Sequence, residues 1–253
     1  MIHVVVPAFN EAGNVEVLLP AISRRFAALG EDHRIVVVDD GSTDATAALC
    51  REVAARDRLP VEVLSLGTNQ GPGVAFRTGF NHVLQTAGAT DLVVTLEGDQ
   101  TSDPAILARM IRRARAEDDD IVLASCYLYG GGIKGTQAHR VGLSHIANGL
   151  MKKALGLSGL ATLSSFYRVY QARALVALRD RYGAEGFITT RGFECMVEIL
   201  YRAAQLRLSI SEVPMVLDGS RRVGGPGRRG SRHQHREGRE ATDHQRPSLA
   251  ACA

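Results

Sequence analysis

The sequence predicts an α/β protein, with one domain built on a mostly parallel central sheet. Short apolar runs alternate with helical patterns through roughly the first half of the 253 residues, the order typical of a doubly wound sheet. The runs are nearly continuous in valine, isoleucine and leucine, as expected of strands covered on both faces. The predicted strands span residues 2–6, 35–38, 61–66, 92–96 and 121–124.

Amphipathic helices are predicted between these strands. Val15, Leu18 and Ile22 follow the first strand at three- and four-residue spacing, which places one apolar stripe against the sheet. Asp44 and Asp103 stand where a helix N-cap is expected. Asp103 also precedes a proline, which favours the first helical turn.

The second half of the chain departs from this rhythm. Three consecutive glycines end the segment 127–132, which predicts a mobile loop because glycine weakens both helices and strands. Further elements are predicted to complete the domain: helices over 139–155, 172–181 and 192–204, and strands over 166–170 and 208–213.

Charge divides the chain near residue 218. Residues 1–218 carry 22 Lys and Arg against 24 Asp and Glu, whereas residues 219–253 carry eight arginines against three acidic residues. The second segment has too few large aliphatic side chains to offset the entropy cost of folding. We therefore expect one domain over 1–218 and a disordered Arg- and Gly-rich tail over 219–253. A translational frameshift is an alternative origin of the tail, because its composition after Val223 resembles out-of-frame reading of a GC-rich gene.

The composition of the tail and the spacing of the cysteines argue against nucleic acid, zinc and disulfides. A basic tail can bind anionic lipid or nucleic acid. Because lysines and interleaved aromatic residues are absent from it, a solvated tail is the favoured interpretation and no nucleic-acid partner is expected. The four cysteines lie far apart without a C-x-x-C pair, which argues against a zinc site or a disulfide framework.

The sequence contains neither a membrane-spanning apolar stretch nor a secretory leader. The protein is therefore expected in the cytoplasm. The apolar face of 143–155 is interpreted as core, and its alternative is peripheral contact with the cytoplasmic face of the membrane.

Acidic residues follow two of the predicted strands. Asp39 and Asp40 end the second strand, and their mutual repulsion would be compensated by a ligand that brings hydrogen-bond donors or a cation. Glu97 and Asp99 flank a glycine after the fourth strand, so both can project to one side and share a hard cation such as Mg²⁺ or Mn²⁺. Open parallel sheets bind ligands at the carboxyl ends of their strands, which makes both pairs candidates for one site.

Ordinary turns are the alternative interpretation of these motifs. Asp44 alone would cap a turn from the second strand into a helix. Gly71 and Gly73 follow the third strand and look like part of a phosphate-binding loop, but neither G-x-G-x-x-G nor a Walker lysine is present. Tight turn geometry accounts for these two glycines equally well.

The combination of motifs resembles family 2 glycosyltransferases, which have the A-type nucleotide-sugar fold. It comprises Val-Val-Val-Pro-Ala-Phe-Asn-Glu (4–11), Val-Val-Val-Asp-Asp-Gly-Ser-Thr-Asp (36–44), Asn69-x-Gly71-x-Gly73 and Glu97-Gly-Asp99. Later motifs resemble the dolichol-phosphate (polyprenyl-phosphate) mannosyltransferase-like branch: Ser-Cys-Tyr (125–127) before glycines, Arg140, Ser-Ser-Phe-Tyr-Arg (164–168), and Glu-Val-Pro (212–214) before Arg222.

The resemblance implies an inverting, metal-dependent hexosyltransferase. It would move a sugar from a nucleotide diphosphate sugar to a polyprenyl (dolichyl) phosphate, in the synthesis of cell-envelope glycans. Asp99 and Arg140 are the implied catalytic residues, Asp99 with Glu97 as ligands of Mg²⁺ or Mn²⁺ and Arg140 as a phosphate ligand. Roles in substrate binding are implied for Pro7, Phe9, Glu11, Asp39, Gly71 and Arg222.

A lipid phosphate is the favoured acceptor because its oxygen is already an anionic nucleophile. A saccharide hydroxyl would need a general base, for which Glu194 is the best candidate. Cys126 stands where this branch often has arginine, and Gly-Pro-Gly (225–227) replaces an expected Ser-Lys. Two alternatives stay open: a catalytically silent subunit that binds nucleotide sugar, and a transferase acting on a saccharide hydroxyl.

Overall fold

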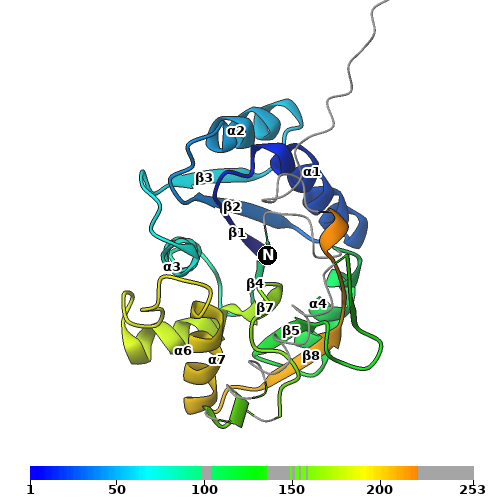
Figure 1. The fold of residues 1–253 in the computed structure, drawn as a ribbon, viewed down its shortest axis with the longest axis vertical. Helices are drawn as coiled ribbons and strands as arrows, with labels where there is room; N and C mark the ends of the chain where they lie inside the picture. Colours follow the sequence, from blue (N-terminus) through cyan, green and yellow to red (C-terminus); the bar gives the residue numbers. More distant parts are fainter. Residues whose placement is uncertain (98–103, 136–148, 150–151, 154, 158, 222–253) are drawn as a thin grey trace, which may run out of the picture. The chain divides into compact units, whose positions relative to one another are not determined.

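The valine-rich runs of the sequence form the strands of one central sheet (Figure 1). The structure, a computed structural model, describes residues 1–97, 104–135, 149, 152–153, 155–157 and 159–221. The strands of the central sheet are β1 (Ile2–Ala8), β2 (His33–Asp39), β3 (Val61–Ser65), β4 (Leu92–Thr95), β5 (Ile121–Ser125), β7 (Arg168–Gln171) and β8 (Ile210–Pro214).

In space the strands follow the order β3-β2-β1-β4-β7-β5-β8. β1 pairs in parallel with β2 and β4, and β2 pairs in parallel with β3. Only β7 runs against its neighbours β4 and β5. The prediction of a mostly parallel sheet is therefore confirmed, and the carboxyl ends of β1, β2 and β4 lie at one edge.

Helices cover both faces of the sheet (Figure 1). One face carries α1 (Ala12–Leu29), α2 (Thr46–Arg56) and α4 (Leu107–Ala116), which follows the short 3-10 helix η1 (Pro104–Ile106). The other face carries α3 (Pro72–Val83), α6 (Ala172–Tyr182) and α7 (Cys195–Gln205). The domain is thus a three-layer α/β/α arrangement with two hydrophobic cores.

Alternation of side chains along the strands explains why the strand sequences are continuously apolar. Ile35 and Val37 of β2 pack in the core under α1, α2 and α4, whereas Val36 and Val38 pack in the core under α3, α6 and α7. Each core also holds one buried free cysteine, Cys50 in the first and Cys195 in the second.

Several parts of the predicted element pattern differ in the structure. The predicted loop 127–132 runs into a short strand, β6 (Gly132–Lys134), which pairs in parallel with β9 (Val216–Asp218). The predicted helix 192–204 starts only at Cys195, and the strand predicted at 166–170 starts at Arg168. The first three residues of the predicted disordered tail form the 3-10 helix η2 (Gly219–Arg221).

Other predictions fall outside the described residues. They include most of the helix predicted over 139–155 and the tail from residue 222 onward. The described residues belong to one compact unit, Met1–Val223. None of the helices among them combines the length and apolarity needed to cross a bilayer.

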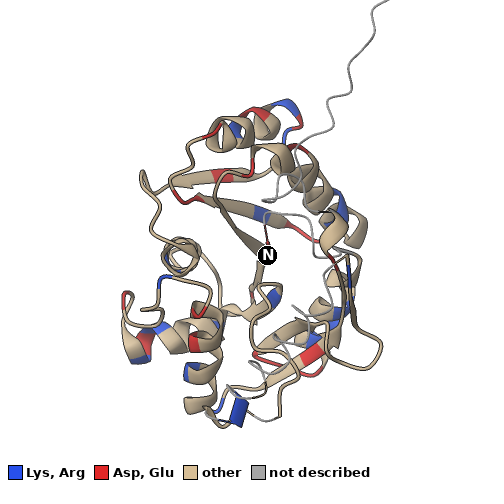
Figure 2. Ribbon diagram, in the orientation of Figure 1, with Lys and Arg blue, Asp and Glu red and all other residues tan. Residues whose placement is uncertain are grey.

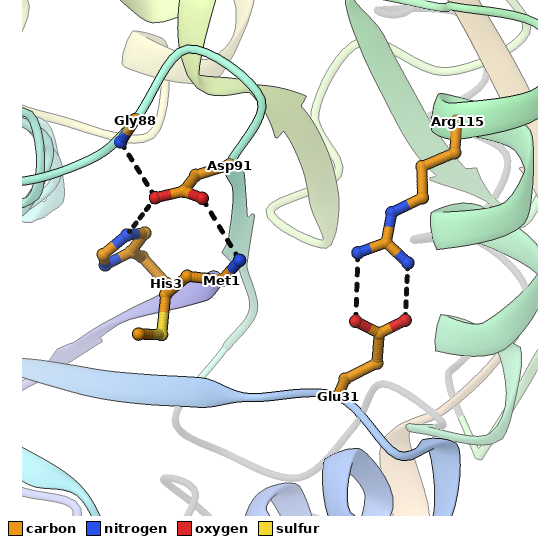
Figure 3. Close-up of polar contacts among 6 residues, drawn as sticks. All are labelled: Met1, His3, Glu31, Gly88, Asp91 and Arg115. Atoms are coloured by element: carbon orange, nitrogen blue, oxygen red, sulfur yellow. Dashed lines mark hydrogen bonds and ion pairs between the residues drawn. The ribbon is translucent and has the colours of Figure 1, made fainter.

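Polar contacts fasten the opposite edge of the sheet, where the strands begin (Figure 3). The carboxylate of Asp91, just before β4, lies 3.1 Å from the amino group of Met1 and 3.2 Å from His3 Nε2, and it accepts the Gly88 N–H at 2.9 Å.

Arginines lie along α4, where Figure 2 shows blue segments, and two of them bind neighbouring parts of the chain. Arg115 binds the carboxylate of Glu31 through two hydrogen bonds of 2.5 and 3.0 Å (Figure 3). Near the other end of the helix, Arg109 donates to the carbonyl oxygen of Pro214 at 2.7 Å.

Candidate functional site

A cavity of about 400 Å³ lies where β1, β2 and β4 end. Pro7 and Phe9 reach it from the end of β1, Asp40 from the end of β2, and Glu97 from just beyond β4. Asn69, Pro72 and Ala75 at the start of α3 and the aromatic residues Phe166 and Phe193 line it further. The cavity therefore occupies the position predicted from the strand ends.

Hydrogen bonds join the loops after β1 and β2. Asn10 has a left-handed backbone with φ of 56°, a conformation that asparagine tolerates better than most residues. Its Oδ1 accepts the N–H groups of Thr43 at 2.8 Å and Asp44 at 3.3 Å, and its own N–H donates to Ser42 Oγ at 2.9 Å. The two motifs that resemble the glycosyltransferase signature are thus one connected structure.

The predicted N-cap of α2, Asp44, lies one residue before the observed N-cap, Ala45, which makes no side-chain cap hydrogen bond. Asp44 binds the first helical residue from outside the helix. Its carboxylate accepts the N–H of Thr46 at 2.9 Å and that of Ala12 at 3.2 Å. Partial burial opposes ionisation of Asp44, but hydrogen bonds from Thr46 and Ala12 outweigh it and lower the pKa of the carboxyl group. Glu11, which lines the cavity, is positioned by the hydrogen bond from its own N–H to Thr46 Oγ1 at 2.8 Å.

The two neighbouring aspartates after β2 have different surroundings. Asp40 accepts the N–H groups of Gln70 at 2.7 Å and Gly71 at 2.8 Å, on the side of α3. Asp39 accepts the N–H of Ser42 at 3.2 Å. Strand alternation directs successive side chains to opposite faces. Backbone amides bind both oxygens of Asp40 and one oxygen of Asp39. Repulsion between the two neighbours is therefore weaker than the argument from sequence assumes.

The glycines before and within α3 allow a second loop to approach closely. The N–H of Gly73 donates to the carbonyl oxygen of Arg191 at 2.8 Å. A Cβ atom on Gly71 would lie 2.4 Å from this oxygen, and one on Gly73 would lie 1.9 Å from the carbonyl oxygen of Thr190. Close packing of these backbones accounts for both glycines without a bound phosphate.

Aromatic rings form the cavity wall beside Glu97. Phe166 stacks on Phe76 of α3 with a centroid separation of 5.4 Å, and Phe193 meets Phe166 edge-on at 5.4 Å. Thr95 Oγ1 donates to the carbonyl oxygen of Phe166 at 2.6 Å, which ties this wall to β4. Phe193 is 70% exposed, so the wall presents an apolar surface to a ligand.

Three carboxylates line the cavity, from Glu11, Asp40 and Glu97, and none of its lining residues in the described part of the chain is Lys or Arg. This charge suits a ligand that arrives with a cation. Across the described ranges, no three His, Cys, Asp or Glu side chains are grouped closely enough to hold a metal alone. A Mg²⁺ ion commonly needs only one or two carboxylates when phosphate and water complete its shell.

The predicted site residues fall into three groups. Four of them line the cavity: Pro7, Phe9, Glu11 and Glu97. Two lie next to it without lining it: Asp39 and Gly71. Three lie outside the described residues: Asp99, Arg140 and Arg222.

The family resemblance implies no role for four other cavity-lining residues, Asp40, Asn69, Phe166 and Phe193, although Asp40 belongs to an acidic pair that the sequence makes a candidate. Strand alternation could have assigned Asp40, rather than Asp39, to the α3 side of the sheet. Asn69 and Phe166 occur in motifs already noted. For Phe193 no local signal exists, because its position depends on packing between α7 and the start of α3.

The fold and the cavity together define an α/β domain with a cavity at the carboxyl edge of its sheet, where open α/β sheets bind ligands. The sequence model of Glycosyl transferase family 2 matches residues 3–178. The chain therefore belongs to this family, and it is a glycosyltransferase.

Two relatives of the chain have names that refer to polyprenyl-linked sugars. Polyprenol monophosphomannose synthase of Mycolicibacterium smegmatis is 29% identical over 212 residues, which cover 84% of this chain and 75% of the relative. Undecaprenyl-phosphate 4-deoxy-4-formamido-L-arabinose transferase of Edwardsiella ictaluri is 29% identical over 190 residues. That match covers 74% of this chain and 54% of the relative, so it spans about half of that longer protein.

A solved structure shares the fold. Glucosyl-3-phosphoglycerate synthase of Mycobacterium tuberculosis superposes with a TM-score of 0.60 at 19% sequence identity, over 86% of this chain and 70% of the other. The predicted fold class, a single glycosyltransferase domain of the A type with a mostly parallel sheet, is confirmed.

Proposed function

We propose that this protein transfers a sugar from a nucleotide diphosphate sugar to a polyprenyl phosphate, with inversion at the anomeric carbon. The cavity with three carboxylates at the ends of β1, β2 and β4 carries the proposal. Both relatives described above are named for polyprenyl-linked sugar chemistry. The acceptor lipid would bring the protein to the membrane surface as a peripheral protein.

Binding of the nucleotide diphosphate sugar would involve a divalent cation. Glu97 and Asp99 would hold Mg²⁺ or Mn²⁺ on the diphosphate, and carboxylate oxygens suit both ions. When bound, the cation would neutralise charge that develops on the leaving diphosphate. The M. tuberculosis structural neighbour has also been solved in complex with Mg²⁺ and UDP. Pro7, Phe9 and Glu11 would frame the nucleoside, with Asp39 and Gly71 beside it.

The acceptor half of the proposal needs no strong base. A phosphate oxygen can attack the anomeric carbon directly, and Arg140 and Arg222 would bind phosphate groups of the reactants. Glu194, the candidate base for a saccharide hydroxyl, is not among the cavity-lining residues, and its carboxylate accepts the N–H of nearby Gly192 at 3.2 Å. The absence of Glu194 from the cavity lining supports the lipid phosphate over a hydroxyl acceptor.

A Glu97→Gln variant tests the proposed metal role. Replacing the carboxylate with a neutral amide is expected to lower Mg²⁺-stimulated transfer to polyprenyl phosphate about 100-fold, because transition-state charge loses its stabilisation. Glu52→Gln, on the exposed side of α2, is the matched control and should transfer at the normal rate. Unchanged transfer by Glu97→Gln, with normal thermal unfolding, would contradict the role of Glu97.

A silent nucleotide-sugar-binding subunit is the second candidate. It is favoured by Cys126, which stands where the resembling branch often has arginine. Burial raises the pKa of this thiol, and the nearby carboxylates of Glu212 and Glu97 raise it further, so the residue is neutral and supplies no positive charge. Calorimetric binding of GDP-mannose or UDP-glucose without any transfer to polyprenyl phosphate would select this candidate.

A further inference from the structure

Glu198 of α7 is surrounded by donors from one short loop. Its carboxylate accepts the backbone N–H of Thr189 at 2.9 Å and that of Thr190 at 3.0 Å. The hydroxyl groups of the same threonines donate to it at 2.5 and 2.8 Å. On the helix itself, Arg202 pairs with it at 2.6 Å. The side chain is only 11% exposed, so these contacts fix its position.

The loop that Glu198 holds, residues 189–192, packs against the start of α3. The carbonyl oxygen of Arg191 accepts the N–H of Gly73, and the absence of Cβ atoms at Gly71 and Gly73 permits this approach. Two parts of the cavity wall meet at this contact. Asn69, Pro72 and Ala75 belong to the α3 side, and Phe193 follows the loop directly.

We propose that Glu198 is a positioning residue that sets the distance between these two parts of the cavity wall. It does not line the cavity itself. It acts through Thr189 and Thr190 on the loop, and through the Arg191 carbonyl on the start of α3. The inference deepens the proposed function, on which it rests, by naming a residue that controls how tightly the site holds its nucleotide sugar.

Asp120 provides a matched control at the other edge of the sheet. Its carboxylate also accepts a backbone N–H and a hydroxyl group from one residue, Ser209, at 2.9 and 3.1 Å. It also pairs with an arginine, Arg173, at 3.2 Å. Asp120 directly precedes β5, at the amino edge of the sheet, whereas the cavity lies at the carboxyl edge. An Asp120→Asn variant therefore removes a comparable set of contacts away from the cavity.

The test compares Glu198→Gln with Asp120→Asn. Hydrogen exchange of the Gly73 amide reports the loop contact without any substrate. It should speed up at least about tenfold in Glu198→Gln, because local opening removes the bond to Arg191, and stay unchanged in Asp120→Asn. Calorimetry with GDP-mannose and UDP-glucose should give a dissociation constant raised about tenfold in Glu198→Gln alone, as expected when a supporting network is lost.

Several results would overturn the inference. One is unchanged exchange at Gly73 in Glu198→Gln, and another is equal weakening of nucleotide-sugar binding by both variants. If Glu198→Gln does not fold, Thr189→Val combined with Thr190→Val keeps the carboxylate and removes only the two hydroxyl donors. This double variant should also speed exchange at Gly73, and normal exchange there would overturn the inference. If the wild-type protein binds neither nucleotide sugar, the proposed function fails while the exchange measurement still decides the role of Glu198.

Discussion

Asp40 shows how one carboxylate can organise a site. It is 3% exposed, and its two oxygens each accept a backbone N–H from the segment that leads into α3. A charge that accepts two amides holds a turn more strongly than a neutral side chain can. The edge of the cavity near Asn69 therefore depends on this single side chain.

An Asp40→Asn variant is expected to lose about 1–3 kcal/mol of the free energy of unfolding, because one buried amide N–H is left without an acceptor. Asp39→Asn should lose less, since Asp39 accepts one N–H, at 3.2 Å. Urea unfolding at neutral pH measures both values. A larger loss in Asp39→Asn than in Asp40→Asn would contradict the assignment.

Asp39 and Asp40 also show which features of single residues the sequence does not predict. The composition of 36–44 was enough to place acidic groups at a strand end. Which of the two aspartates faces α3 depends on the parity of β2, and the hydrogen-bond partners come from residues about 30 positions away. Local pattern predicts the strand but not these distant contacts.

At the scale of elements, α4 is joined to the segment before β2 by the pair of Arg115 and Glu31. Glu31 is 21% exposed and Arg115 is 46% exposed, so solvent screens much of their attraction. The hydrogen bonds from Arg115 nevertheless lower the pKa of Glu31 below its ordinary value of 4.5. A lowered pKa in the folded state means that the pair stabilises the protein above that pH and loses its contribution as the pH falls.

We therefore expect Glu31→Gln to reduce the free energy of unfolding by about 0.5 kcal/mol at pH 7 and low salt. The difference in unfolding free energy between the variant and the wild-type protein should shrink in 1 M salt, where charges are screened over roughly 3 Å. It should also shrink as the pH falls below the pKa of free glutamate, because Glu31 then becomes protonated. Urea unfolding over a pH series measures it. A difference that grows on acidification would contradict the pairing.

Elements also differ in how far the sequence predicts them. The five parallel strands of the first half each follow from a local apolar run. The antiparallel insertion of β7 between β4 and β5, and the pairing of β6 with β9, depend on partners far along the chain. Strand direction and distant pairing leave no periodic signal in the sequence, which is why the pattern of runs predicted a sheet but not its full order.

At the scale of the whole molecule, the sheet separates two cores that do not share a helix layer. Cavity residues include Glu11, at the start of α1 in one layer, and Pro72 and Ala75 of α3 in the other, so the site requires both layers to be folded. Loss of packing in either layer is therefore expected to affect the cavity.

The buried cysteines allow the opening of each hydrophobic core to be measured by alkylation, because each core holds one of them. Burial raises the pKa of Cys50 to about 11 and that of Cys195 to about 12, so the thiolates that react with iodoacetamide are scarce at pH 8. Cys126 is only partly buried. Among the three cysteines that the structure describes, peptide-resolved alkylation of the native protein should modify Cys126 first. Modification of Cys195 as fast as Cys126 would contradict the burial. Because Cys50 and Cys195 lie on opposite sides of the sheet, alkylation reads the loosening of each layer separately, and Glu198→Gln should accelerate it at Cys195 alone.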